Sequence, residues 1–171
     1  MTLELTSTAL AHGGEILSKY TCDGQDVSPP LAWSGVPAEA KSLVLIIDDP
    51  DAPDPAAPKM TWVHWVLYNM PPSASALPEG ARQLPAGTLE GVNDWKRTGY
   101  SGPCPPIGRH RYFHKLYALD ILLQRRSLRH RSRATLLRRL SSWEPTRSAS
   151  ECNAATHSTC RRIHLTLAPQ R

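Results

Sequence analysis

Residues 61–69 read TWVHWVLYN, an unbroken series of aromatic and β-branched side chains that is closed by Pro71 and Pro72. Such residues favour a β-strand, and the prolines after it prevent the ladder from continuing. Alternation along this strand would place Trp62, His64, Val66 and Tyr68 on one face, and Val63, Trp65 and Leu67 on the other. Because both faces are largely apolar, we expect the strand to lie inside a sheet or between two layers.

Two further strands flank it in the sequence. Lys41 to Asp48 (KSLVLIID) is a short aliphatic run that stops at an Asp-Pro pair, and Arg109 to Asp120 (RHRYFHKLYALD) alternates so that one face carries His110, Tyr112, His114, Leu116 and Ala118. The segments between them, residues 48–59, 71–91 and 99–108, are dense in proline and glycine and cannot be helices. The pattern predicts an all-β protein, an antiparallel β-sandwich with long ordered loops.

The charge of the chain divides it into two parts. Residues 1–123 hold 9 basic and 13 acidic side chains, a net charge of 9 − 13 = −4. Residues 124–171 hold 11 arginines, no lysine and 2 acidic side chains, a net charge of 11 − 2 = +9. The overall charge of +5 describes neither part, so it is no evidence for a nucleic-acid partner except through the Arg-rich tail.

Composition also excludes several classes of protein. The longest apolar run, Leu43–Ile47, is far shorter than the roughly 20 residues of a transmembrane helix. The first ten residues contain Glu4 and no basic segment, so they do not resemble a secretory signal. Four cysteines, none in C-x-x-C spacing, are too few for a disulfide scaffold. We therefore expect a cytoplasmic protein without a transmembrane segment, with mostly reduced thiols and no cofactor.

The residues that carry chemistry lie at strand ends and in loops. Asp49 and Asp51 leave the first predicted strand, His64 lies in the second, Gly102 and Pro103 open a rigid loop, and His110 and Tyr112 begin the third strand. Imidazoles, a phenol and exposed backbone N–H groups can donate hydrogen bonds to the oxygens of a small anion, while a carboxylate fixes an imidazole tautomer or accepts a ligand ammonium. Trp62 is interpreted as core packing, pocket lining, or both.

Several short motifs follow one another in the order of a known family. They are Tyr20-Thr21-Cys22-Asp23-Gly24, Ser28-Pro29-Pro30-Leu31-x-Trp33, Asp49-Pro50-Asp51-Ala52-Pro53, Trp62-x-His64-Trp65, Asn93-Asp94, Gly99-Tyr100-x-Gly102-Pro103-Cys104-Pro105-Pro106 and His110-Arg111-Tyr112. With these motifs residues 4–123 resemble the phosphatidylethanolamine-binding proteins, in the bacterial branch often called Raf kinase inhibitor-like.

The resemblance implies an antiparallel β-sandwich with a small pocket for phosphoryl and other anionic groups, including phospholipid headgroups. By motif position, the pocket residues would be Asp49, Trp62, His64, Gly102, Pro103, His110 and Tyr112, with Asp51 at its rim. The expected function is binding of a small phosphorylated or anionic ligand without catalysis, and the residues suggest no metal site there. The alternative is a regulatory module that inhibits a kinase or protease partner.

An enzyme is the less favoured reading. The sequence has no nucleophile elbow, no phosphate-binding P-loop and no His-Glu-x-x-His motif. A hydrolase that activates water with His64 and Asp49 is conceivable. Because no nucleophile or metal set stands out, we expect the protein not to be an enzyme.

Cys22 and Cys104 lie in two of the matched motifs, and we interpret them as two buried thiols that are not bonded to each other. A close pair able to form a disulfide is the alternative.

The sequence also departs from the family at two positions: Lys96 stands where relatives have glycine, and His114 stands where an aromatic residue is expected in the third strand. If position 96 needs a positive φ, Lys96 is strained there.

After Asp120 the family pattern stops, and the helical turns and C-terminal helix expected of relatives are missing or replaced. We favour a frameshifted end for residues 124–171, with low order, which would leave apolar surface of the sandwich uncovered and destabilise it. A second reading is a genuine basic appendage for nucleic acid or anionic lipid, in which residues 125–139 form an Arg-rich helix. A third is a zinc site built from Cys152, His157, Cys160 and His164, whose spacing matches no standard finger.

Overall fold

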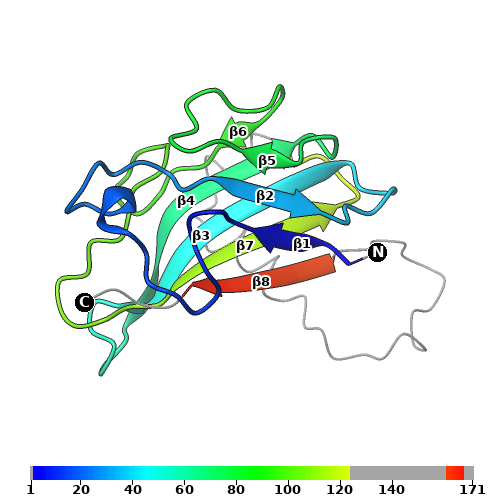
Figure 1. Ribbon diagram of the computed structural model, residues 1–171. Coiled ribbons are helices and arrows are strands. Elements are labelled where there is room, and N and C mark those ends of the chain that lie inside the picture. Colours follow the sequence, from blue (N-terminus) through cyan, green and yellow to red (C-terminus); the bar gives the residue numbers. More distant parts are fainter. Residues whose placement is uncertain (1, 124–160, 168–171) are drawn as a thin grey trace, which may run out of the picture.

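The proline-rich segments connect strands that pair antiparallel in two stacked sheets, as the computed structural model in Figure 1 shows. The structure describes residues 2–123 and the backbone of residues 161–167. One sheet has the order β1-β2-β5, with the bounds Glu4–Thr6, Leu31–Ser34 and Ala76–Leu77. The other has the order β6-β4-β3-β7-β8, with the bounds Leu89–Glu90, Met60–Met70, Ser42–Ala52, Tyr112–Leu119 and Arg161–Leu167. Within these described ranges, the 3₁₀ turn η1 (Ser18–Tyr20) is the one helical element.

The predicted sandwich is therefore confirmed, and so are its three central strands. Residues 61–69 lie in β4, which is buried on both faces between β3 and β6. The run from Lys41 to Asp48 forms β3, but β3 continues to Ala52, because Asp49 and Ala52 remain paired with residues of β4. The third strand, β7, begins at Tyr112 rather than at Arg109. The carboxylates expected in a loop thus belong to a strand.

The main core fills the space between the two sheets. Its buried side chains come from both layers and comprise Leu3, Leu5, Leu31, Trp33, Leu43, Leu45, Ile47, Trp65, Leu67, Met70, Leu77, Leu116 and Ala118. A second apolar cluster occupies the other face of the five-stranded sheet, with Val44, Ile46, Val63, Val66, Tyr68, Tyr117 and Leu119. Alternation along β3 and β7 sends successive residues to these two clusters.

The ladder between β3 and β4 contains a register shift at His64. Ile47 pairs with Trp65, whereas Asp48 pairs with Val63, so His64 is an extra residue on β4. An extra residue of this kind is a β-bulge, which bends a strand and changes the direction of the side chains beyond it. Asp49 consequently pairs with Trp62.

The strict alternation predicted for residues 61–69 is wrong because of this bulge. Val63 packs in the outer cluster with Val66 and Tyr68, instead of opposite them. Trp62 is paired with Asp49, two residues after Ile47 on β3, and therefore lies on the inner face of the sheet together with Trp65. The bulge thus brings the side chains at the start of β4 to the face that carries Asp49.

The C-terminal region contains one described element. Residues 161–167 pair with β7 as the edge strand β8, which the sequence patterning did not indicate. Residues 124–160 and 168–171 lie outside the described residues, and with them the proposed Arg-rich helix, the low order of the tail and most of the candidate zinc ligands. The boundary at residue 123 therefore stays a prediction. In the part of the chain that the structure describes, no helix has the length and apolar character needed to cross a membrane.

His114 is a buried polar residue in the middle of β7. Its side chain is 2 % exposed, and neither ring nitrogen makes a hydrogen bond to a described residue. Burial, followed by the nearby His64, lowers the pKa of His114 from 6.5 to about 3. Since the unfolded chain binds this proton more readily than the folded one, stability is expected to fall as pH decreases from 6.5 toward 3.

We predict that His114→Phe raises the free energy of unfolding by about 1–3 kcal/mol at pH 7, because it removes two buried ring nitrogens that have no hydrogen-bond partner among the described residues. It should also flatten the loss of stability between pH 6.5 and 3. Urea unfolding across this pH range measures both effects. The exposed His12→Gln serves as the control for removing one imidazole, and a His114→Phe variant less stable than the wild type at pH 7 would contradict the prediction.

Candidate ligand-binding site

A cavity of about 270 Å³ opens where β3 ends, β4 begins and β7 begins. The loop that precedes β7 closes one side of it. The residues that line the cavity are Asp49, Ala52, Pro53, Trp62, His64, Trp95, Cys104, Pro105, Pro106, His110 and Tyr112. Its volume lies just below the range of about 300–1,000 Å³ typical of small-molecule sites, so it can hold a headgroup-sized ligand.

Asp49 and His110 form a buried pair on one wall of the cavity. Nδ1 of His110 lies 2.6 Å from Oδ2 of Asp49, and Nε2 of His110 lies 2.9 Å from the carbonyl oxygen of Ile107. Both ring nitrogens of His110 thus lie against hydrogen-bond acceptors. Oδ1 of Asp49 accepts a further hydrogen bond from the backbone N–H of Asp51 at 2.8 Å. The protein therefore holds both side chains of the pair in fixed orientations.

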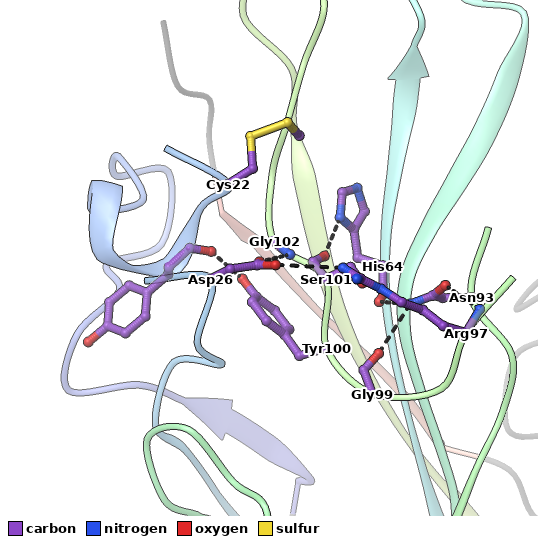
Figure 2. A network of polar contacts seen from close by, with 11 residues as sticks. Cys22, Asp26, His64, Asn93, Arg97, Gly99, Tyr100, Ser101 and Gly102 are labelled. Atoms are coloured by element: carbon purple, nitrogen blue, oxygen red, sulfur yellow. Dashed lines mark hydrogen bonds and ion pairs between the residues drawn. A yellow bond between two sulfur atoms is a disulfide. The ribbon is translucent and has the colours of Figure 1, made fainter. Parts of the chain in front are cut away.

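His64 lies on another wall, and its orientation is set by a backbone carbonyl. Nδ1 of His64 donates to the oxygen of Ser101 at 2.7 Å, as Figure 2 shows. Nε2 is buried and has no hydrogen-bond partner among the described residues. Burial lowers the pKa of His64, while the Ser101 carbonyl and the charge of Asp49 act in the opposite direction.

Tyr112 and Trp62 line the cavity, and each carries one polar atom without a described hydrogen-bond partner. The hydroxyl of Tyr112 and Nε1 of Trp62 are buried, and neither makes a hydrogen bond within residues 2–123 or to the described edge strand. The ring of Tyr112 packs edge-on against that of His64, with centroids 5.2 Å apart. Burial, followed by the charges of Asp49 and Asp51, raises the pKa of Tyr112, so its hydroxyl keeps its proton. Both atoms can therefore donate to a ligand.

Trp95 also lines the cavity and was not predicted as a site residue. Its ring packs edge-on against Trp62 at 5.3 Å and His64 at 4.9 Å between centroids, yet it remains 36 % exposed. It precedes Lys96, which has a φ of 62°. This left-handed conformation is one that glycine adopts at little cost, so Lys96 is strained at the position where we noted the missing glycine.

We predict that Lys96→Gly stabilises the protein by about 1 kcal/mol, because it removes the steric cost of the left-handed conformation. Thermal and urea unfolding measure the change. Lys59→Gly provides a matched control, since Lys59 is also exposed but does not have a positive φ, and we expect it to be neutral or destabilising. A lower stability of Lys96→Gly than of Lys59→Gly would contradict the prediction.

The structure brings together five of the eight residues predicted for the site, namely Asp49, Trp62, His64, His110 and Tyr112. The other three, Asp51, Gly102 and Pro103, do not line the cavity. Cys104, Pro105 and Pro106 follow them in the same motif and form the lining instead. The motif therefore identified the correct loop, but its last three residues line the cavity instead of the two residues before them.

Asp51 and Gly102 hold the surroundings of the cavity in place. The carboxylate of Asp51 is buried and accepts hydrogen bonds from the backbone N–H of Arg111 at 2.8 Å and from its Nη2 at 2.6 Å. These hydrogen bonds lower the pKa of Asp51 despite burial. Gly102 donates its N–H to Asp26 at 2.6 Å, and a Cβ there would lie 2.3 Å from the oxygen of Tyr20, so no larger residue fits (Figure 2).

The interpretation of Cys22 and Cys104 as buried, unbonded thiols is wrong. The two residues form a disulfide with Cα atoms 5.4 Å apart, and both are exposed. The backbone N–H of Cys22 also donates to the oxygen of Pro103 at 3.0 Å. The bond therefore connects the loop that lines the cavity to the segment after η1, across a sequence separation of 82 residues.

We predict that the double variant Cys22→Ser/Cys104→Ser loses about 2–4 kcal/mol of stability, because a cross-link over a long segment restricts the unfolded chain. Urea unfolding with and without a reductant gives the test. A reductant should lower the midpoint of the wild type and leave the double variant unchanged. Equal midpoints for the reduced and oxidised wild type would contradict the prediction.

Comparisons with known proteins agree with this fold. The family model of the phosphatidylethanolamine-binding proteins matches residues 6–157 of the chain. A protein of Methanothermobacter thermautotrophicus, named UPF0098 protein, is 52% identical over 124 residues, which are 71% of this chain and 79% of the relative. The chain belongs to the phosphatidylethanolamine-binding protein family.

Two solved structures are similar over almost the whole chain. A phosphatidylethanolamine-binding protein homolog of Chlamydia trachomatis, CT736, has a TM-score of 0.77 at 36% identity, with 99% of this chain and 98% of that chain covered. YbcL of E. coli, described as a member of the mammalian family, has a TM-score of 0.72 at 26% identity and covers 98% of both chains. The family match thus reaches beyond residue 123, where we expected it to end.

Proposed function

We propose that the protein binds a small phosphorylated or anionic group, such as a phospholipid headgroup, in this cavity and does not turn it over. The observation that carries the proposal is the set of three buried polar atoms without described partners on Trp62, His64 and Tyr112. Buried polar groups in folded proteins nearly always have a hydrogen-bond partner. A ligand in the cavity would supply partners for all three.

The chemistry of the lining supports binding rather than catalysis. The one cysteine among the lining residues, Cys104, forms a disulfide with Cys22, so it has no free thiol to act as a nucleophile. His110 is held by Asp49 and Ile107 through both ring nitrogens, which leaves it no position to transfer a proton to a ligand. The cavity volume of about 270 Å³ suits a headgroup, and the acyl chains of an intact lipid would lie outside it.

The test is a titration with phosphoethanolamine followed by tryptophan fluorescence, since Trp62 and Trp95 both line the cavity. We expect saturable binding at millimolar concentration or below. Tyr112→Phe should weaken it about two- to tenfold, as expected for the loss of one hydrogen bond, and His64→Ala should weaken it more. His12→Ala, an exposed histidine elsewhere, is the matched control.

Two outcomes would contradict the proposal. Absence of any spectral change at millimolar phosphoethanolamine would favour the alternative, a regulatory module that binds a kinase or protease partner. Release of inorganic phosphate that disappears in His64→Ala would instead show an enzyme.

A further inference from the structure

The backbone of the protein fixes which nitrogen of His64 carries the proton. A carbonyl oxygen only accepts hydrogen bonds, so Nδ1, at 2.7 Å from the oxygen of Ser101, must be the protonated nitrogen. In the neutral ring Nε2 then holds a lone pair and is an acceptor. This atom is buried, and no described residue donates to it.

Three hydrogen bonds hold Ser101, so the position of its carbonyl is fixed by the protein. Its backbone N–H donates to the oxygen of His64 at 3.3 Å. Its hydroxyl oxygen lies 3.0 Å from Nδ2 of Asn93 and 3.0 Å from Nε of Arg97, and both nitrogens donate to it (Figure 2). Asn93 also donates to the oxygen of Gly99 at 3.2 Å. The tautomer of His64 is thus set by a network that reaches the surface at Arg97.

Burial and two nearby carboxylates act on His64 in opposite directions. Six groups lie around His64 on the neighbouring elements: Asp49 of β3, Tyr112 and His114 of β7, His110 before β7, Asp26 of the loop after η1, and Trp95 of the cavity lining. Asp49 is paired with His110, and Asp26 lies 3.6 Å from a guanidinium nitrogen of Arg97. Burial is the largest influence that remains, and it lowers the pKa of His64.

The polar atoms of the cavity therefore have defined roles. Tyr112 and Trp62 offer donors, and His64 offers an acceptor. A ligand that matches them has unprotonated oxygens for the donors and one hydroxyl hydrogen for Nε2 of His64. A phosphomonoester that carries one proton has this composition, whereas a sulfate ester or a phosphodiester has no such hydrogen.

We propose, resting on the binding function proposed above, that the cavity selects a phosphomonoester in its singly protonated form, with the phosphate hydroxyl donating to Nε2 of His64. The doubly charged form binds only with uptake of one proton from solution. Phosphomonoesters lose this proton with a pKa of about 6, so their affinity falls as pH rises above that value. Phosphodiesters, including the headgroups of intact phospholipids, bind more weakly than the corresponding monoester.

The experiment measures the affinity of three ligands between pH 5 and 8.5 by isothermal titration calorimetry. They are phosphoethanolamine, its sulfate analogue 2-aminoethyl hydrogen sulfate, and the diester glycerophosphoethanolamine. Above pH 7 the affinity for phosphoethanolamine should fall about tenfold per pH unit, as one bound proton requires. At pH 7 it should exceed the affinity for each of the other two ligands at least tenfold.

His64→Gln separates proton selection from simple loss of binding. Its side-chain amide both donates and accepts, so the slope with pH and the preference over the sulfate ester should both disappear. His12→Gln is the control and should keep both. Persistence of the slope in His64→Gln would overturn the assignment to His64.

The outcomes distinguish the two proposals. If none of the three ligands binds, the proposed function fails. If all three bind with similar affinity, or if the affinity for phosphoethanolamine rises with pH, the cavity binds anions but does not select the protonated form. The inference then fails, and the proposed function stands.

Discussion

The ladder between β3 and β4 has three register shifts, and the structure of the site depends on the one at His64. With His64 as a bulge, Trp62 comes opposite Asp49, on the face of the sheet that looks into the sandwich. A regular ladder would place Val63 opposite Asp49, and the side chains of Trp62 and Asp49 would then point to opposite faces. The bulge therefore turns the end of an apolar core into a polar cavity without interrupting the sheet.

Hydrogen bonds and a disulfide from neighbouring segments hold the polar residues of the cavity in place. Asp49 holds His110, the carbonyl of Ser101 holds His64, and the bond between Cys22 and Cys104 ties the lining loop to the neighbouring segment. Each of these partners comes from a different element. Because the atoms are oriented before a ligand arrives, binding would cost little reorganisation.

The sequence was sufficient to predict the sandwich, its three central strands and five of the lining residues. The strands follow from patterns with a period of two, whereas the lining residues were assigned from the motifs that resemble the family. Asp51 and Gly102 were assigned to the site because they lie within such motifs, but in the structure they contact Arg111 and Asp26 at the back of it. A motif indicates which segments lie near the site, but it does not indicate which of their side chains point into it.

Other features could not be predicted because they depend on contacts between distant parts of the chain. The bulge at His64 arises from pairing with β3 and has no signature in residues 61–69. Cys22 and Cys104 are 82 residues apart, and only the packing of two loops shows that they meet. The edge strand β8 lies in a region whose composition differs from the rest, and its pairing with β7 was missed for that reason.

The measurement that tests the central claim most directly is ¹⁵N NMR of the histidine side chains, with and without phosphoethanolamine. In the protein alone at neutral pH, we predict that His64 carries its proton on Nδ1 and that Nε2 is unprotonated. On addition of the ligand, the Nε2 resonance of His64 should move as it accepts a hydrogen bond. A proton on Nε2 in the protein alone, or an Nε2 signal that does not respond to ligand, would contradict this description of the site.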